Sequence, residues 1–152
     1  MTNEAPQEFN FYSERFGIDL SEVEETNPYM FGRELADWLC GQLMQKGYET
    51  EVVPEDWGWC VVCQRKPYTL FVGCLSALDQ NLIERCEDRS STAPILWRAI
   101  PVAEKSIIQR LSNNEDVEPG YQKLREDVHS ILRSEPSVRF ATDQEIDEWE
   151  DK

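Results

Sequence analysis

The chain has 152 residues, of which 40% are hydrophobic and 11% aromatic, so it contains enough apolar material for one core. Its 30 acidic and 15 basic residues give a formal net charge of -15 at pH 7. A field of this sign repels phosphate backbones and argues against direct nucleic-acid binding. It is compatible with simple solubility or with a protein partner that has a basic surface.

The amino-terminal segment Met1–Glu8 lacks the basic and apolar regions of a secretory signal. No apolar run approaches the ~18 residues needed to span a bilayer. Five cysteines, an odd number, are then typical of free thiols in a reducing compartment. We therefore expect a cytoplasmic protein without a membrane partner.

The clearest predicted element is an amphipathic helix from Asn27 to Lys46. Asn27 is a favourable N-cap, and Pro28 at the first helical position loses no hydrogen bond. Gly47 is suited to the left-handed conformation that ends many helices. The apolar side repeats at four-residue spacing through Phe31, Leu35, Leu39 and Leu43. Such a helix is expected to cover a sheet.

Strands are predicted before and after a turn at Arg65-Lys66-Pro67, because the flanking segments are rich in β-branched and aromatic residues. The three predicted strands are Tyr48–Val53, Trp57–Gln64 and Tyr68–Leu75. With a two-residue loop, the hairpin would pair Cys60 with Phe71 and Gly58 with Gly73.

The sequence pattern of the carboxyl-terminal half predicts a polar surface loop at residues 79–93, followed by further strands and helices. The expected elements are a strand at Ile95–Ile100, helices at Ala103–Leu111 and Pro119–Arg133, an edge strand at Val138–Phe140, and a last helical turn begun by a Thr142–Glu145 capping box. We expect one α+β domain over residues 1–152, with loosely ordered acidic ends at 1–26 and 142–152. Its antiparallel sheet would have four or five strands, with helices mainly on one face.

The motif Cys60-Val61-Val62-Cys63 is a candidate for zinc binding or thiol exchange. Its neighbours predict a strand, however, and residues three apart on a strand project to opposite faces. Cys60 and Cys63 therefore could not share a metal ion, and we expect buried structural thiols.

Other enzymatic signatures are also missing from the sequence. His129 is the single histidine, no Gly-x-Ser-x-Gly segment accompanies it, and the seven glycines form no phosphate-binding loop. The sequence thus predicts no catalytic residue, no metal and no cofactor.

The segment Glu55-Asp56-Trp57-Gly58-Trp59 is the candidate partner-binding site. Trp57 and Trp59 are expected on one face, and Gly58 facing Gly73 would leave a shallow gap on the second face, where a bulky group could approach the backbone. Aromatic rings next to carboxylates would receive Arg or Lys side chains of a partner, or a small cation. Alternatively, the tryptophans belong to the core and the two carboxylates form a polar turn.

The run from Asn27-Pro28 through Leu35-Ala36-Asp37-Trp38-Leu39 to the E-D-W-G-W segment is similar to a pattern in small uncharacterised bacterial proteins. Size, acidity and α+β content also resemble the immunity proteins that neutralise interbacterial toxins. This resemblance implies a role in binding and inhibition, and it assigns no residue a function.

Two hypotheses of different classes follow. The first is a non-enzymatic cytoplasmic protein that binds and inhibits a basic protein partner through Glu55, Asp56, Trp57 and Trp59. The alternative is a small carboxylate-based hydrolase, with or without a divalent ion, or a small-ligand-binding protein. The alternative requires convergent carboxylates in a concave site.

Overall fold

The computed structural model describes residues 6–18, 22, 26, 31–76 and 95–150. Its strands are β1 (Phe9–Tyr12), β2 (Glu51–Glu55), β3 (Gly58–Gln64), β4 (Thr69–Ser76), β5 (Leu96–Glu104) and β6 (Arg139–Phe140). Its helices are α1 (Arg33–Gln45), α3 (Ile107–Ser112), α4 (Glu118–Ser134) and α5 (Asp143–Glu150). The strands form one antiparallel sheet in the order β2-β3-β4-β5-β1-β6. The α+β class is confirmed, with six strands rather than four or five.

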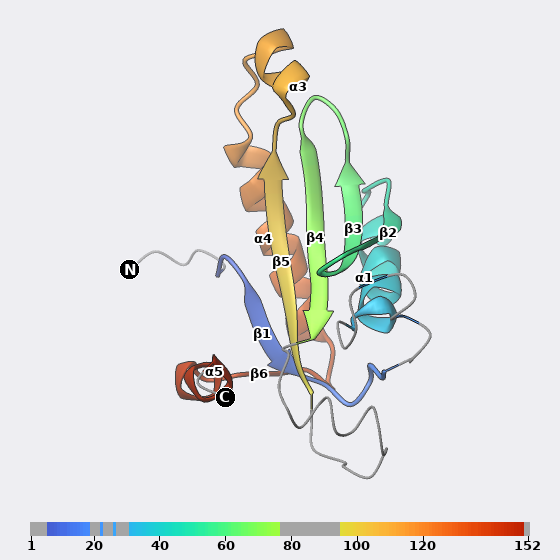
Figure 1. Cartoon of the computed structure of the whole chain (residues 1–152), viewed down its shortest axis with the longest axis vertical. Helices are drawn as coiled ribbons and strands as arrows, with labels where there is room; N and C mark the ends of the chain where they lie inside the picture. Colours follow the sequence, from blue (N-terminus) through green and yellow to red (C-terminus); the bar gives the residue numbers. More distant parts are fainter. Residues whose placement is uncertain (1–5, 19–21, 23–25, 27–30, 77–94, 151–152) are drawn as a thin grey trace.

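Helices α1 and α4 pack against the same face of the sheet, which Figure 1 shows behind the strands. Alternate strand residues point into this layer and meet the apolar sides of both helices. The four-residue repeat of α1 is fully buried there. The buried core includes Phe31, Leu35, Leu39, Leu43, Trp59, Val61, Val72, Trp97, Leu124 and Val128. The predicted amphipathic helix over a sheet is therefore confirmed.

The start of α1 differs from the prediction, because the helix begins at Arg33. Asn27 and Pro28 lie outside the described residues, so their predicted capping role stays a prediction. The carboxylate of Glu22, which is fully buried, accepts hydrogen bonds from the backbone N–H groups of Gly32 and Arg33 at 3.0 and 2.8 Å. Free N–H groups at a helix start favour such an anion. At the other end Gly47 has a φ of 103°, as predicted.

The β3–β4 register also differs from the prediction by two residues. Cys60 lies opposite Gly73, and Trp59 lies opposite Cys74. The loop between the strands runs over residues 65–68, and the register shifts between Val62 and Gln64. A two-residue loop was therefore the wrong premise, and the predicted Gly58–Gly73 pair does not form.

The strands and helices predicted in the carboxyl-terminal half are confirmed, with changed bounds, whereas the predicted surface loop at residues 79–93 lies outside the described residues. The predicted strand from Ile95 extends to Glu104, so the short helix begins only at Ile107. Thr142 and Glu145 exchange hydrogen bonds with each other's backbone N–H groups at 3.0 and 3.1 Å, which is the predicted capping box of α5.

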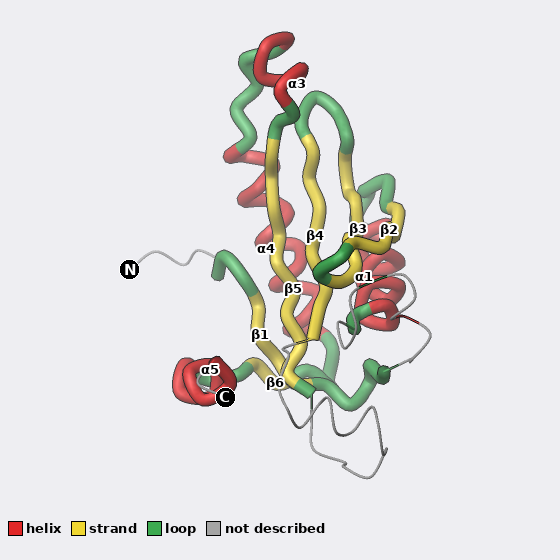
Figure 2. The backbone as a smooth tube through the Cα atoms, viewed as in Figure 1, coloured by secondary structure: helices red, strands yellow, loops and turns green. Residues whose placement is uncertain are grey.

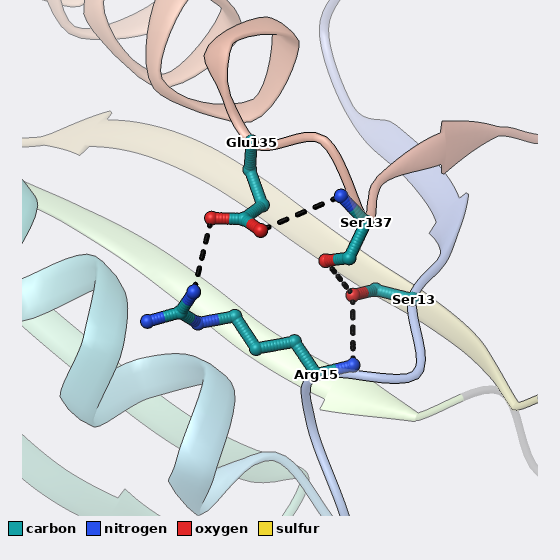
Figure 3. A network of polar contacts seen from close by, with 4 residues as sticks. All are labelled: Ser13, Arg15, Glu135 and Ser137. Carbon is teal, nitrogen blue, oxygen red and sulfur yellow. Dashed lines mark hydrogen bonds and ion pairs between the residues drawn. The ribbon is translucent and has the colours of Figure 1, made fainter.

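A polar network joins the segment after β1 to the end of α4 (Figure 3). The Ser13 and Ser137 hydroxyls are 2.7 Å apart, and Arg15 donates to the Glu135 carboxylate at 3.2 Å. Glu135 also accepts from the Ser137 backbone N–H at 3.4 Å. These contacts join segments more than one hundred residues apart in the chain, at the edge where β6 pairs with β1.

Within the described residues, none of the helices combines the length and the apolar character that crossing a bilayer requires.

Candidate functional site

Neither α1 nor α4 covers the opposite face of the sheet, and we call the part of that face over β2, β3, β4 and β5 the helix-free face. The strand alternation directs apolar side chains to it as well as to the core. They are half-buried or buried: Val53, Cys60, Val62, Phe71, Leu75, Ile100 and Val102. An apolar sheet face without a covering helix is a candidate interaction surface.

Trp57 lies on this helix-free face. It belongs to the turn between β2 and β3, which crosses in front of β4 on the side away from α4 (Figure 2). An ideal Cβ atom at Gly73 would lie 3.0 and 3.1 Å from two carbons of the indole. The missing side chain of Gly73 thus makes room for the ring. Trp57 remains 37% exposed, so its outer side is accessible to solvent.

Two exposed carboxylates accompany Trp57. Glu55 ends β2 and lies opposite Gly58, and Asp56 is the next residue of the turn. Burial is the main cause that raises the pKa of the Cys60 thiol to about 12, and the negative charge of Glu55 is the second. Glu104 of β5 acts on Cys60 in the same direction, while Arg65 lowers the thiol's pKa. The surface around Trp57 therefore combines an aromatic ring with the negative charges of Glu55 and Asp56.

Trp59 is not part of this surface. It is 3% exposed and packs in the core between the sheet and the helices. The Arg33 guanidinium lies 5.3 Å from the centre of its ring, at the start of α1. The prediction that Trp57 and Trp59 share one face is wrong, because Trp57 lies in the turn before β3 and folds over the opposite face.

The two cysteines of the C-x-x-C motif lie on opposite faces, as predicted. Cys63 belongs to the core under the helices, whereas Cys60 lies opposite Gly73 on the helix-free face. Burial is the main cause that raises the pKa of Cys63 to about 12. Within the described residues, no group of three His, Cys, Asp or Glu side chains is arranged to bind a metal ion.

His129 is enclosed by aromatic rings. It stacks on Phe9 with ring centres 5.3 Å apart. The ring of Phe140 is nearly perpendicular to that of His129, with ring centres 5.8 Å apart. Burial is the main cause that lowers the pKa of His129 from its usual value, and the positive charge of Arg133 is the second. A base of this kind would need an acid or a nucleophile in contact with it, and these two ring contacts provide neither.

An open groove of about 900 Å³ was not predicted from the sequence. It lies between the end of α1 with the following loop and the end of β3. Its lining residues are Met44, Gly47, Tyr48, Glu49, Thr50, Glu51, Val62, Cys63, Gln64, Arg65 and Lys66. The lining comes from two separate segments of the chain, residues 44–51 and 62–66, so no local motif marks the groove. Glu55 and Asp56 are not among the residues that line it.

Comparisons with known proteins gave no significant match to any family model, curated protein or solved structure. The assignment of function therefore depends on the geometry of the surfaces described above. The resemblance to immunity proteins stays a prediction.

Proposed function

We propose that this chain is a non-enzymatic cytoplasmic protein that binds and inhibits a basic protein partner. The observation that supports this most is the exposed indole of Trp57, seated on Gly73 and flanked by the carboxylates of Glu55 and Asp56. Aromatic side chains of this kind anchor protein interfaces, because they bury much apolar area for few rotatable bonds. The role suits an immunity protein whose partner is a cationic toxin.

The charge of the chain supports the same proposal. A formal charge of -15 attracts a basic partner over long range and accelerates encounter. The half-buried apolar residues of the helix-free face would then exclude water around Trp57 after docking. Arg or Lys side chains of the partner would pair with Glu55 and Asp56 and contact the indole ring.

The test begins with capture of a partner from the native host at low salt, followed by kinetics with the purified partner. Raising the ionic strength is expected to slow association, because salt screens the steering charges. Trp57→Ala is expected to accelerate dissociation about tenfold or more. The double variant Glu55→Lys/Asp56→Lys should slow association.

The matched control for the charge change is Glu14→Lys/Glu126→Lys, since both residues are exposed and lie outside the Trp57 surface. The proposal requires the variants near Trp57 to weaken binding more than this control does. Equal effects of the two double variants would show that only net charge matters. An association rate that is indifferent to salt would contradict the steering by acidic residues.

A second candidate function is the binding of a small ligand in the groove beside Tyr48. The groove is large enough for a small molecule, and Lys66 in its lining would pair with an anionic group of a ligand. Its wall includes Glu51, which is paired with Arg65 at 3.0 Å. Thermal-shift measurements with a panel of small anions would test this function, and Lys66→Glu should abolish any shift that arises in the groove.

A further inference from the structure

One end of the molecule consists of α3 and the β3–β4 turn, and we call these residues, 65–67 and 105–113, the tip (Figure 1). Two side chains fasten the helix to the turn. Gln109 donates a hydrogen bond to the carbonyl of Arg65 at 2.7 Å, and Asn113 donates to the carbonyl of Pro67 at 3.1 Å. The helix therefore has a fixed orientation on the end of the sheet.

The tip exposes three large aliphatic side chains next to one another. Ile107 is 75% exposed, Ile108 76% and Leu111 84%. A single exposed aliphatic residue is common on protein surfaces and needs no explanation. Three on a helix of six residues form a cluster, and a cluster of this kind is typical of an interaction surface.

The geometry of α3 keeps this cluster pointed outward. Ser106 caps the helix, and its hydroxyl and backbone N–H exchange hydrogen bonds with Gln109. Gln109 is on the side that faces the β3–β4 turn. Ile107 and Leu111 are one helical turn apart, and with Ile108 they occupy the opposite side. Local hydrogen bonds thus specify which side of the helix is presented to solvent.

The tip differs from the rest of the molecule in its charge. Four of the chain's 15 basic residues lie in it: Arg65, Lys66, Lys105 and Arg110. Arg65 is paired with Glu51 of β2, whereas Arg110 is exposed and adjoins the aliphatic cluster on α3. Residues 65–67 and 105–113 contain no Asp or Glu, so the tip is locally basic in a chain with a net charge of -15.

We propose that the tip is a second docking surface, and that its occupant is an acidic amphipathic segment of another protein. The apolar side of such a segment would cover Ile107, Ile108 and Leu111, and its carboxylates would pair with Lys66 and Arg110. A second copy of this chain is disfavoured, because a whole molecule of charge -15 would face another, whereas a short segment meets chiefly the local positive charge of the tip. An anionic membrane is disfavoured because its extended negative surface would also face the acidic remainder of the chain.

The test uses two synthetic peptides that share one amphipathic leucine pattern. One has glutamate at every polar position and the other has lysine. Both are titrated into the isotopically labelled full chain, and backbone amide shifts locate the binding. The glutamate peptide is expected to shift the amides of Ile107, Ile108 and Leu111. The lysine peptide is expected to leave these amides unchanged.

Two variants establish which forces act. The double variant Ile108→Ser/Leu111→Ser changes only exposed side chains. It should weaken the binding of the glutamate peptide about tenfold. Lys66→Glu/Arg110→Glu should weaken it similarly, whereas Lys46→Glu, an exposed cation outside the tip, is the matched control. Trp57→Ala should leave this binding unchanged, so failure at the tip and failure of the proposed function are distinguishable.

Three results would overturn the proposal. The first is the absence of amide shifts in the tip at saturating glutamate peptide, and the second is equal binding of both peptides there. The third is a different occupant. It would be shown if Ile108→Ser/Leu111→Ser abolished self-association seen by analytical ultracentrifugation, or abolished binding to phosphatidylcholine or phosphatidylglycerol vesicles.

Discussion

The indole of Trp57 covers Gly73 of β4, where an ideal Cβ atom would lie 3.0 Å from the ring. The turn between β2 and β3 thus reaches across the sheet and places an aromatic ring on the helix-free face. The contact depends on a residue without a side chain at position 73, which gives the first prediction.

Gly73→Ala is expected to displace the Trp57 ring and to lower the free energy of unfolding by about 1 kcal/mol. The cost is modest because the ring is partly exposed and can move outward. The matched control is Gly41→Ala in the exposed side of α1, where nothing lies within 4 Å. That change should stabilise the helix by about 0.5–1 kcal/mol. Denaturant unfolding measures the change in the free energy of unfolding for both variants. An unchanged indole resonance of Trp57 in the Gly73→Ala protein would contradict the contact between Trp57 and Gly73.

Glu22→Ala is expected to lower the free energy of unfolding by about 2–4 kcal/mol, because it leaves the N–H groups of Gly32 and Arg33 without the acceptor they use. Glu22→Gln keeps an acceptor oxygen and should lose less. Glu126→Ala, an exposed change on α4, should have an effect near zero. Equal stability of the Glu22→Ala protein and the unmodified chain in urea would show that Glu22 does not cap α1.

The thiols of Cys60 and Cys63 should resist alkylation in the folded protein. Burial raises the pKa of both thiols to about 12, so very little of either is present as the reactive thiolate at pH 8. Cys40 is only half-buried and should react with iodoacetamide earlier. Peptide mass spectrometry at timed intervals measures the order in which the cysteines are alkylated. If Cys60 reacted as fast as Cys40, the helix-free face would be more open than the structure shows.

Acid is expected to destabilise the protein through His129. Its pKa is lowered in the folded state, so the unfolded state binds the proton more readily. The stabilisation from the neutral ring is therefore fully present above about pH 6.5 and decreases as the pH falls below it. His129→Phe removes this titration. The stability difference between the two proteins should stay constant above about pH 7 and shift in favour of the variant in acid. If the stabilities of the two proteins changed in parallel down to acid pH, the role of His129 in acid destabilisation would be contradicted.

Local patterns were sufficient to predict the helices and most strands. The repeat of Leu35, Leu39 and Leu43 predicts α1 because burial of one helix side is a property of nearby residues. The cap of the same helix could not be predicted, since Glu22 is ten residues away from Gly32 and reaches it only in the folded chain. Such a contact has no signature in sequence spacing.

The candidate site was predictable only in part. Glu55, Asp56 and Trp57 are exposed together at the end of β2 and in the turn that follows, but Trp59 is buried on the other face. The error arose because the expected strand included Trp57, and strand alternation then placed both rings on one side. The aliphatic cluster of α3 was also missed, since apolar residues in a short helix ordinarily indicate burial.

The most direct test of the central claim is an amide-shift titration of the labelled chain with the lysine form of the amphipathic peptide at low salt. We predict that Trp57, Gly73 and Ile100 shift together, and that Trp57→Ala and added salt both weaken the binding. Shifts confined to other surfaces, or affinity unchanged by the loss of Trp57, would contradict a basic partner at this face.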